Sequence, residues 1–372
     1  MAQTSHGVGG LTYDASKRNR PPELNVLFAL ILIVVVFEVL GWLLIGNSFL
    51  FNTRDDVDTL FNNQRLTIII LQVSTVGIIA IGVTQVIISG GIDLSSGSIV
   101  GATAMIAMSF AQTAIVNGNP NPKAIFGEAW MDLWVIVPVI VGMACGLFAG
   151  VINGVLIAYT RIPPFIATLG MMVSARGAAK WWSNGNPISF PTESFANIAN
   201  GDFLGAITFG LVSAKGLNPV LIFISLAVLF HLVLTYTKYG KYCYAIGSNE
   251  QAARMSGINV DGHKVLVYTI AGLLAALAAI VLSSKNLTAQ AGMGVMYELD
   301  AIAMTVIGGV SLSGGRGSVI GTVIGALIFG VIISGFTFLQ LDAYYQEMVK
   351  GAIIVGAVVL DVWRQKRRAM GA

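Results

Sequence analysis

Seven long apolar runs constrain the fold of this chain more than any other feature of its sequence. Hydrophobic residues make up 55% of the chain and charged residues only 10%, whereas an average soluble domain carries about 25% charged residues. A helix needs about 20 mainly apolar residues to cross a bilayer, and inside lipid its backbone must satisfy its own hydrogen bonds. The sequence therefore predicts an all-α, polytopic membrane bundle, with clear spans over 26–46, 66–88, 133–159, 217–236, 265–283, 318–339 and 348–363.

Three further runs are shorter or less apolar, and they complete the predicted bundle of about ten transmembrane helices. They cover 98–116, 163–182 and 301–312. An even number of crossings puts both ends of the chain on one side of the membrane. The first run is longer than a signal-peptide core and no small-residue cleavage site follows it, so we expect it to remain as an anchor. The predicted parts are a polar N-terminal tail (1–25), a transmembrane domain (26–363) and a basic C-terminal tail (364–372).

Basic residues are distributed unevenly between the two predicted sides. Cytoplasmic loops of membrane proteins carry an excess of lysine and arginine. With the N-terminus inside, the cytoplasmic segments hold 13 of the 21 basic residues. The basic cluster at 364–368 would then lie beside the anionic lipid headgroups of the inner leaflet. The bias predicts that both termini are cytoplasmic.

A polar segment over 238–263 separates two predicted spans on the cytoplasmic side. Residues 249–255 have helix-forming composition, with Ser248 or Asn249 suited to the N-cap and Gly257 to the C-terminal stop. We expect a short, rigid helical knob that docks on a partner protein. The alternative is a helix lying on lipid headgroups, but the balanced charges differ from those of a basic amphipathic membrane helix.

Asp93 lies where one predicted span ends and the next begins. A charged side chain at the centre of a membrane helix costs about 2.5–3.5 kcal/mol and by default indicates function. Gly90 and Gly91 suit the end of one helix and Asp93 or Ser95 the cap of the next, so a capped break is the simpler interpretation. A broken helix also exposes backbone dipoles to a polar solute, which makes Asp93 and Ser95 candidates for a substrate pathway.

Three more polar side chains within apolar runs are candidates for the same pathway. They are Asn153, Thr168 and Thr305. The competing interpretation is that these side chains bond a neighbouring helix, as is common in membrane bundles. Glu38, within the first run, is expected to face the bundle or a partner chain rather than lipid.

The sequence contains no pattern typical of a catalytic or cofactor site. Residues 312–316 look like the signature of ATP-binding cassettes, but the chain has no phosphate-binding G-x-x-x-x-G-K-[ST] loop. We interpret 312–316 as a tight cytoplasmic turn, whose sequence echoes 90–101. The three histidines and two cysteines lie in different settings, so no metal or cofactor is expected. A net charge of +3 gives no reason to expect a nucleic-acid partner.

Five stretches together resemble the permease subunits of bacterial ATP-binding-cassette importers for monosaccharides, in the ribose- and xylose-type branch. They are SGGIDLSSGS (89–98), NGVLIAYTRIPPFIATLGMM (153–172), YAIGSNEQAARMSGI (244–258), YELDAIAMTVIGGVSLSGGRGS (297–318) and VKGAIIVGAVVLD (349–361). They occur in the family's order, which is more specific than a single motif. The first 25 residues and the loop near 183–216 lie outside the resemblance.

The resemblance implies a transport subunit that does not itself hydrolyse ATP. It implies three partners: a cytoplasmic ATP-binding subunit, a periplasmic sugar-binding protein, and a second permease, which is either another copy of this chain or a close relative. The assembly would lie in the lipid of the bacterial inner membrane. The coupling helix gripped by the ATPase would comprise Gly247, Asn249, Glu250, Ala252, Ala253, Arg254, Ser256 and Gly257.

A secondary transporter of small polar solutes, driven by an ion gradient, is the alternative function. Such a transporter requires intramembrane acids paired with polar residues near the midplane. Glu38 and Asp93 are the available acids, and Asp93 lies at the end of a span. A membrane scaffold without transport activity fits the composition but gives no role to glycine-broken helices.

Overall fold

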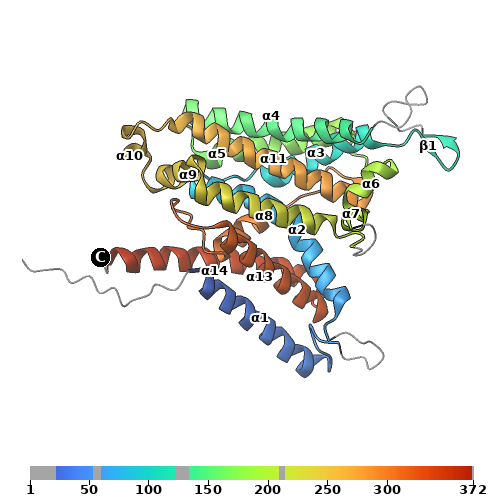
Figure 1. The fold of residues 1–372 in the computed structure, drawn as a ribbon, viewed down its shortest axis with the longest axis horizontal. Helices are drawn as coiled ribbons and strands as arrows, with labels where there is room; N and C mark the ends of the chain where they lie inside the picture. Colours follow the sequence, from blue (N-terminus) through green and yellow to red (C-terminus); the bar gives the residue numbers. More distant parts are fainter. Residues whose placement is uncertain (1–21, 53–59, 122–123, 125–133, 209–213, 371–372) are drawn as a thin grey trace, which may run out of the picture.

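Helices form almost all of the regular secondary structure in the described part of the chain. The computed structural model describes all residues except 1–21, 53–59, 122–123, 125–133, 209–213 and 371–372 (Figure 1). Within the described residues there are two antiparallel pairs of strands, and each strand has two residues. These pairs are β1 (Ile115–Val116) with β2 (Asn119–Pro120), and β3 (Ile188–Ser189) with β4 (Thr288–Ala289). The predicted all-α class is confirmed. Most of the predicted tail over 1–25 lies outside the described residues.

Six of the described helices are long and apolar enough to cross a membrane. The helices that contain these spans are α1 (Pro22–Leu44), α2 (Asn63–Ile88), α4 (Ile136–Thr160), α8 (Asn218–Tyr236), α11 (Val260–Asn286) and α13 (Val319–Phe338). The other four predicted runs also coincide with helices, namely α3 (Ser96–Ala111), α5 (Pro164–Trp182), α12 (Tyr297–Ile307) and α14 (Ala343–Met370). Every predicted run therefore contains a helix, although the runs over 98–116 and 301–312 continue past the ends of α3 and α12. Six of the ten helices meet the length and composition required of a span.

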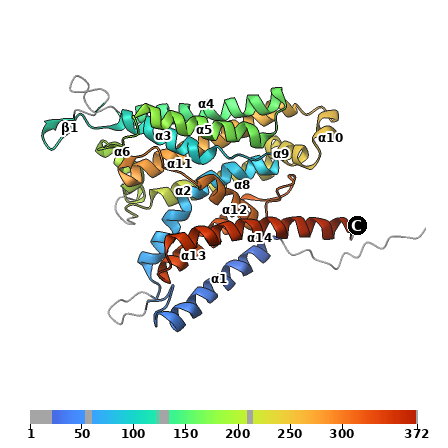
Figure 2. The same ribbon diagram turned by 180° about the vertical axis from the view of Figure 1, so that it is seen from behind.

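The helices form two groups with α2 between them. Helices α3, α4, α5 and α11 lie together, while α1, α12, α13 and α14 form a second group, in which α13 packs against α1 and α12, and α12 packs against α14 (Figures 1 and 2). Helix α2 packs against α11 of the first group and α13 of the second. Every residue of α2 from 73 to 88 is buried. Because α2 is enclosed by protein while α1 exposes much of its apolar surface, α2 is the structural centre of the bundle.

Glycines allow α4 and α11 to approach each other closely. A Cβ atom at Gly146 would lie 2.3 Å from the carbonyl oxygen of Gly272, and one at Gly150 would lie 2.5 Å from that of Tyr268. Residues four apart share one helix face, and small residues on such a face let membrane helices pack backbone to backbone. The glycine ridge of α4, which makes this contact, consists of Gly142, Gly146, Gly150 and Gly154.

The two ends of the bundle carry different short elements. Helices α9 (Lys238–Ser248) and α10 (Glu250–Met255) lie at one end, together with the start of α1 and the end of α14 (Figure 1). The β1–β2 hairpin, α6 (Glu193–Asn200) and α7 (Phe203–Ile207) lie at the opposite end. We call these the α10 end and the β1 end. Both ends of the described chain are thus at the α10 end, as an even number of crossings requires.

Candidate functional site

Helix α10 is the short helix predicted inside the polar segment. The side chain of Asn249 caps it by accepting a hydrogen bond from the amide of Ala252 at 2.9 Å. Gly257 follows the helix with φ +83°, a left-handed conformation that favours glycine. The predicted helix, its cap at Asn249 and its stop at Gly257 are confirmed.

Ion pairs clamp α10 to the first turn of α11. The guanidinium of Arg254 donates to both carboxylate oxygens of Asp261, at 2.8 and 2.7 Å. Glu250 pairs with Lys264 at 2.8 Å and with Arg254 at 3.3 Å. Burial alone would raise the pKa of Glu250, but the hydrogen bonds and charges of Lys264 and Arg254 outweigh it and hold this pKa below its ordinary value. The network fixes the direction in which α10 points.

The surface of α10 differs from what its sequence suggests. Ala253 is only 4% exposed, because it packs with Ile246 and Val260 in a small apolar cluster. Met255 is 89% exposed at the end of the helix, and a large exposed apolar side chain marks a contact surface when it is part of a patch. Sequence reasoning missed Met255, although an apolar residue in an otherwise polar helix is a detectable signal. The exposed tip consists of Gln251, Ala252, Met255 and Ser256.

Gly247, at the end of α9, lies against two glycine-rich turns. A Cβ atom there would be 1.8 Å from the carbonyl oxygen of Ile88 and 2.5 Å from the amide nitrogen of Gly315. The amide of Gly315 in turn donates to the Ile88 carbonyl at 2.8 Å. The predicted turn at 312–316 is therefore present, and it touches the turn at 88–91, next to the 90–101 segment that its sequence echoes. The glycine junction of Gly90, Gly247, Gly314 and Gly315 joins α9 to both turns.

Polar contacts also join α9 to the spanning helices. The hydroxyl of Tyr239 donates to the Gln85 side chain on α2 at 2.7 Å, and that of Tyr244 donates to the Gly317 carbonyl at 2.9 Å. The thiol of Cys243 lies 3.2 Å from Nε2 of His263. Burial raises the pKa of the Cys243 thiol to about 12, so this thiol stays protonated near neutral pH.

Four of the five predicted pathway residues lie in and around the break between α2 and α3. Asp93 accepts hydrogen bonds from the amide and hydroxyl of Ser95, at 2.8 and 2.6 Å. The amide of Asn153 on α4 donates to the Ser95 hydroxyl at 2.8 Å. Thr168 on α5 donates to the carbonyl of Pro164 at 2.9 Å and lies 3.5 Å from that of Ile92. All four side chains are buried.

The break between α2 and α3 is closed by a turn rather than by the expected helix cap. Ser95 occupies the N-cap position of α3 without a side-chain capping bond, and Asp93 bonds Ser95 itself. Thr305 lies apart on α12, where its hydroxyl donates to the Ile302 carbonyl at 2.7 Å. The expected link between neighbouring helices is present at Asn153, and the role of these residues in substrate passage stays a prediction.

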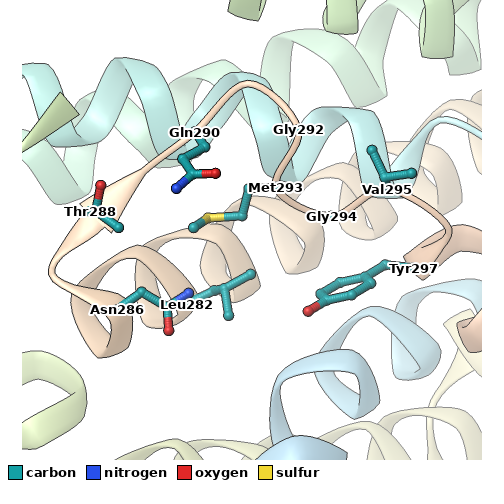
Figure 3. A pocket seen from close by; sticks show the side chains of 9 residues that line it. All are labelled: Leu282, Asn286, Thr288, Gln290, Gly292, Met293, Gly294, Val295 and Tyr297. Carbon is teal, nitrogen blue, oxygen red and sulfur yellow. The ribbon is translucent and has the colours of Figure 1, made fainter. Parts of the chain in front are cut away.

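A cavity of about 530 Å³ opens along the connection between α11 and α12. None of the five predicted pathway residues lines it. Figure 3 shows Gln290 and Met293 on the connection, Tyr297 at the start of α12, and Leu282 and Asn286 on α11 around this space. Across the described part of the chain, no group of three His, Cys, Asp or Glu side chains could hold a metal ion.

The fold and these sites define a bundle of apolar, membrane-capable helices, with a buried break between α2 and α3 and a clamped helix at one end. The sequence matches the family described as "Branched-chain amino acid transport system / permease component" over residues 65–358. Because the match covers more than half of the chain, the chain belongs to this family. The chain is therefore a transport subunit and not an enzyme.

Curated relatives cover most of the chain. The ribose import permease protein RbsC of Bacillus subtilis (strain 168) is 42% identical over 78% of this chain and 82% of that protein. The protein of the same name from Escherichia coli (strain K12) is 37% identical over 92% of this chain and 94% of its own length. The galactose/methyl galactoside import permease protein MglC of Escherichia coli (strain K12) is 36% identical over 83% of this chain and 90% of its own length. The resemblance to monosaccharide import permeases is confirmed. No solved structure matches the chain.

Proposed function

We propose that this chain is the transmembrane permease of an ATP-driven importer for a monosaccharide or a related polyol. The relatives named above are permeases for ribose and for galactose or its methyl glycoside. The importer would also contain a cytoplasmic ATP-binding subunit, a periplasmic sugar-binding protein and a second permease copy, which supplies the other half of the pathway. It would lie in the lipid of the bacterial inner membrane.

The proposed topology has ten crossings and places the α10 end in the cytoplasm. Helices α3, α5, α12 and α14 would add to the six long apolar helices. The excess of basic residues on one side supports this orientation. The start of α1 and the end of α14 lie at the same end of the bundle as α10, which supports an even number of crossings (Figure 1).

The clamped helix α10 is the observation that carries the proposal. Its tip exposes Met255, while the ion pairs of Arg254 and Glu250 and the packing of Ala253 against Val260 join the helix to α11. We assign the tip to a cleft of the ATP-binding subunit. Of the residues expected to couple the permease to the ATP-binding subunit, Ala253 and Gly247 would contribute by packing inside the permease rather than by touching the partner. Asn249 and Gly257 would define the helix ends, and Glu250 and Arg254 its angle, leaving Ala252 and Ser256 to face the partner.

The glycine junction offers a route from α10 to the interior. A movement of α9 toward these turns must displace the Ile88 carbonyl or the Gly315 amide, because there is no free space between Gly247 and either group. Ile88 ends α2, and the turn after it leads to Asp93 and Ser95. The docked ATPase would in this way act on the break between α2 and α3, where we place part of the substrate pathway.

Transport driven by an ion gradient has less support. Glu38 accepts a hydrogen bond from the hydroxyl of Ser48 and two from the backbone amides of Phe49 and Leu50, at 3.1 and 3.0 Å. Its carboxylate thus anchors the segment after α1, which is a structural role and agrees with the expectation that it avoids lipid. Of the two intramembrane acids that the sequence indicated, Glu38 and Asp93, Asp93 therefore remains available to a mechanism driven by an ion gradient.

Co-purification tests the proposal directly. The wild-type chain would be isolated from native membranes beside Met255→Glu and a control, Asn119→Glu, which adds the same charge on the exposed β1–β2 hairpin. We expect an ATP-binding subunit to accompany the wild type and the control but not Met255→Glu. Retention of the ATPase by all three would exclude the tip of α10 as the docking surface. Absence of an ATPase from the wild type would contradict the importer itself.

A further inference from the structure

We propose that the cavity between α11 and α12 is a binding site for a neutral monosaccharide that enters the permease. This inference rests on the proposed import function and adds a site that is separate from the buried residues around Asp93. Its volume of about 530 Å³ lies within the range of about 300–1,000 Å³ that is typical of small-molecule sites.

The cavity presents polar groups that the protein itself does not use. The side-chain amides of Asn286 and Gln290 are exposed and Tyr297 is half-buried. Within the described residues none of these three polar groups has a hydrogen-bonding partner in the protein, so each is open to a solute that displaces water. Each of these groups can both donate and accept a hydrogen bond, and so can every hydroxyl of a sugar. The ring of Tyr297 and the side chains of Leu282 and Met293 supply apolar surface for the C–H faces of a sugar ring (Figure 3).

The lining offers no charged partner to an ionic solute. It contains no acidic or basic side chain. A zwitterionic amino acid would find no opposite charge there for its ammonium or its carboxylate group, whereas a neutral polyhydroxylated solute needs none. The chemistry of the cavity therefore favours a sugar over the amino acids in the description of the family.

The connection that forms the cavity is held from behind. The guanidinium of Arg176 on α5 donates to the carbonyls of Ala291 and Met293, at 2.6 and 2.9 Å. On the other side of the cavity Thr288 lies in β4, paired with β3, and its hydroxyl lies 2.8 Å from that of Ser189. A site whose backbone is fixed in advance loses less entropy on binding. Arg176 is thus a positioning residue for this site.

The position of the cavity suits the start of a pathway. It lies at the end of α11 away from α10, which the proposed topology places outside. A Cβ atom at Gly294 would lie 2.4 Å from the carbonyl oxygen of Gly97, so the connection packs on the first turn of α3, just after Asp93 and Ser95. Tyr297 also begins α12. A solute leaving the cavity is therefore beside the first turns of both short helices. A few neutral hydrogen bonds give the weak affinity that passage requires.

The test uses the complete importer, with its ATP-binding subunit and sugar-binding protein, reconstituted in proteoliposomes. The variant is Asn286→Leu combined with Gln290→Leu. The control is Leu287→Asn, since Leu287 lies between the same elements, does not line the cavity and has φ +55°, which asparagine tolerates. Uptake of labelled ribose and galactose is measured together with ATP hydrolysis stimulated by the loaded binding protein.

We expect sugar uptake by the double variant to fall about tenfold or more, since each lost hydrogen bond changes an equilibrium by about two- to tenfold. ATP hydrolysis should stay within twofold of the wild type, so that more ATP is consumed per sugar. Uptake within twofold of the wild type would overturn the inference, as would a parallel loss of uptake and hydrolysis in a correctly assembled complex. A wild-type importer that carries neither sugar but does carry leucine would instead refute the proposed function.

Discussion

Replacing Gly247 by alanine should destabilise the junction between α9 and the two glycine turns. The added Cβ would lie 1.8 Å from the Ile88 carbonyl oxygen, and real Cβ atoms essentially never come within 3.0 Å of another heavy atom. Both near neighbours are backbone atoms, so no side chain can turn aside. Overpacking of this kind costs about 1–3 kcal/mol, and the displaced hydrogen bond from Gly315 to Ile88 adds about 0.5–1.5 kcal/mol. We expect a loss of about 2–4 kcal/mol.

The matched control is Gly170→Ala, because Gly170 also lies inside a helix but has no heavy atom within 4 Å of the added Cβ. Alanine stabilises a helix interior by about 0.5–1 kcal/mol relative to glycine. Thermal unfolding of the purified protein in detergent should therefore give a lower Tm for Gly247→Ala and an equal or higher Tm for Gly170→Ala. Hydrogen exchange of the 312–316 segment should accelerate only in Gly247→Ala. Equal Tm values and equal exchange rates for the two variants would refute the close approach of these backbones.

Further predictions concern the packing of α4, the clamp on α10 and a buried thiol. Gly150→Leu should abolish the yield of monodisperse protein, because the backbone of α11 lies against Gly150. Val155→Leu, on the exposed face of α4, should be tolerated. Equal yields of the two variants would contradict the glycine ridge. The lowered pKa of Glu250 means that its ion pairs stabilise α10 above the unfolded-state pKa of about 4.3 and that this stability is lost as the pH falls through the folded-state pKa. The protection factors of the backbone amides of 250–255 against hydrogen exchange should therefore fall as the pH is lowered in the wild type, and Glu250→Gln should remove this fall. Cys243, with its pKa near 12, should resist alkylation by iodoacetamide at pH 8 in the folded protein, which mass spectrometry would detect.

Much of this architecture could be predicted because it is local in sequence. Apolar runs define the helices, since a backbone in lipid has no other way to satisfy its hydrogen bonds. Asn249 and Gly257 mark the ends of α10 because capping depends on residues within one or two turns. The turn at 312–316 follows from its glycines for the same reason.

The unpredicted features depend on contacts between distant segments. The sequence predicts that Ala253 belongs to an exposed docking helix, but Ile246 and Val260 bury its side chain. The sequence also predicts that Gly247 contacts the ATP-binding subunit, whereas its neighbours in the structure are the turns at 88–91 and 312–316. The four-residue spacing of glycines in α4 was visible in the sequence, yet only the fold shows that α11 is the partner. The cavity between α11 and α12 was missed because its lining residues become a site only when Arg176 and β3 hold the connection in place.

The central claim is that this chain carries a monosaccharide inward with energy from ATP hydrolysed by a partner. It is tested most directly by uptake of labelled ribose and galactose into proteoliposomes that contain the permease, the ATP-binding subunit and the loaded binding protein, with no ion gradient across the membrane. We predict uptake of at least one sugar that requires ATP and that stops when the ATP-binding subunit is omitted. Uptake that proceeds with an imposed ion gradient alone, without ATP or its subunit, would contradict the account.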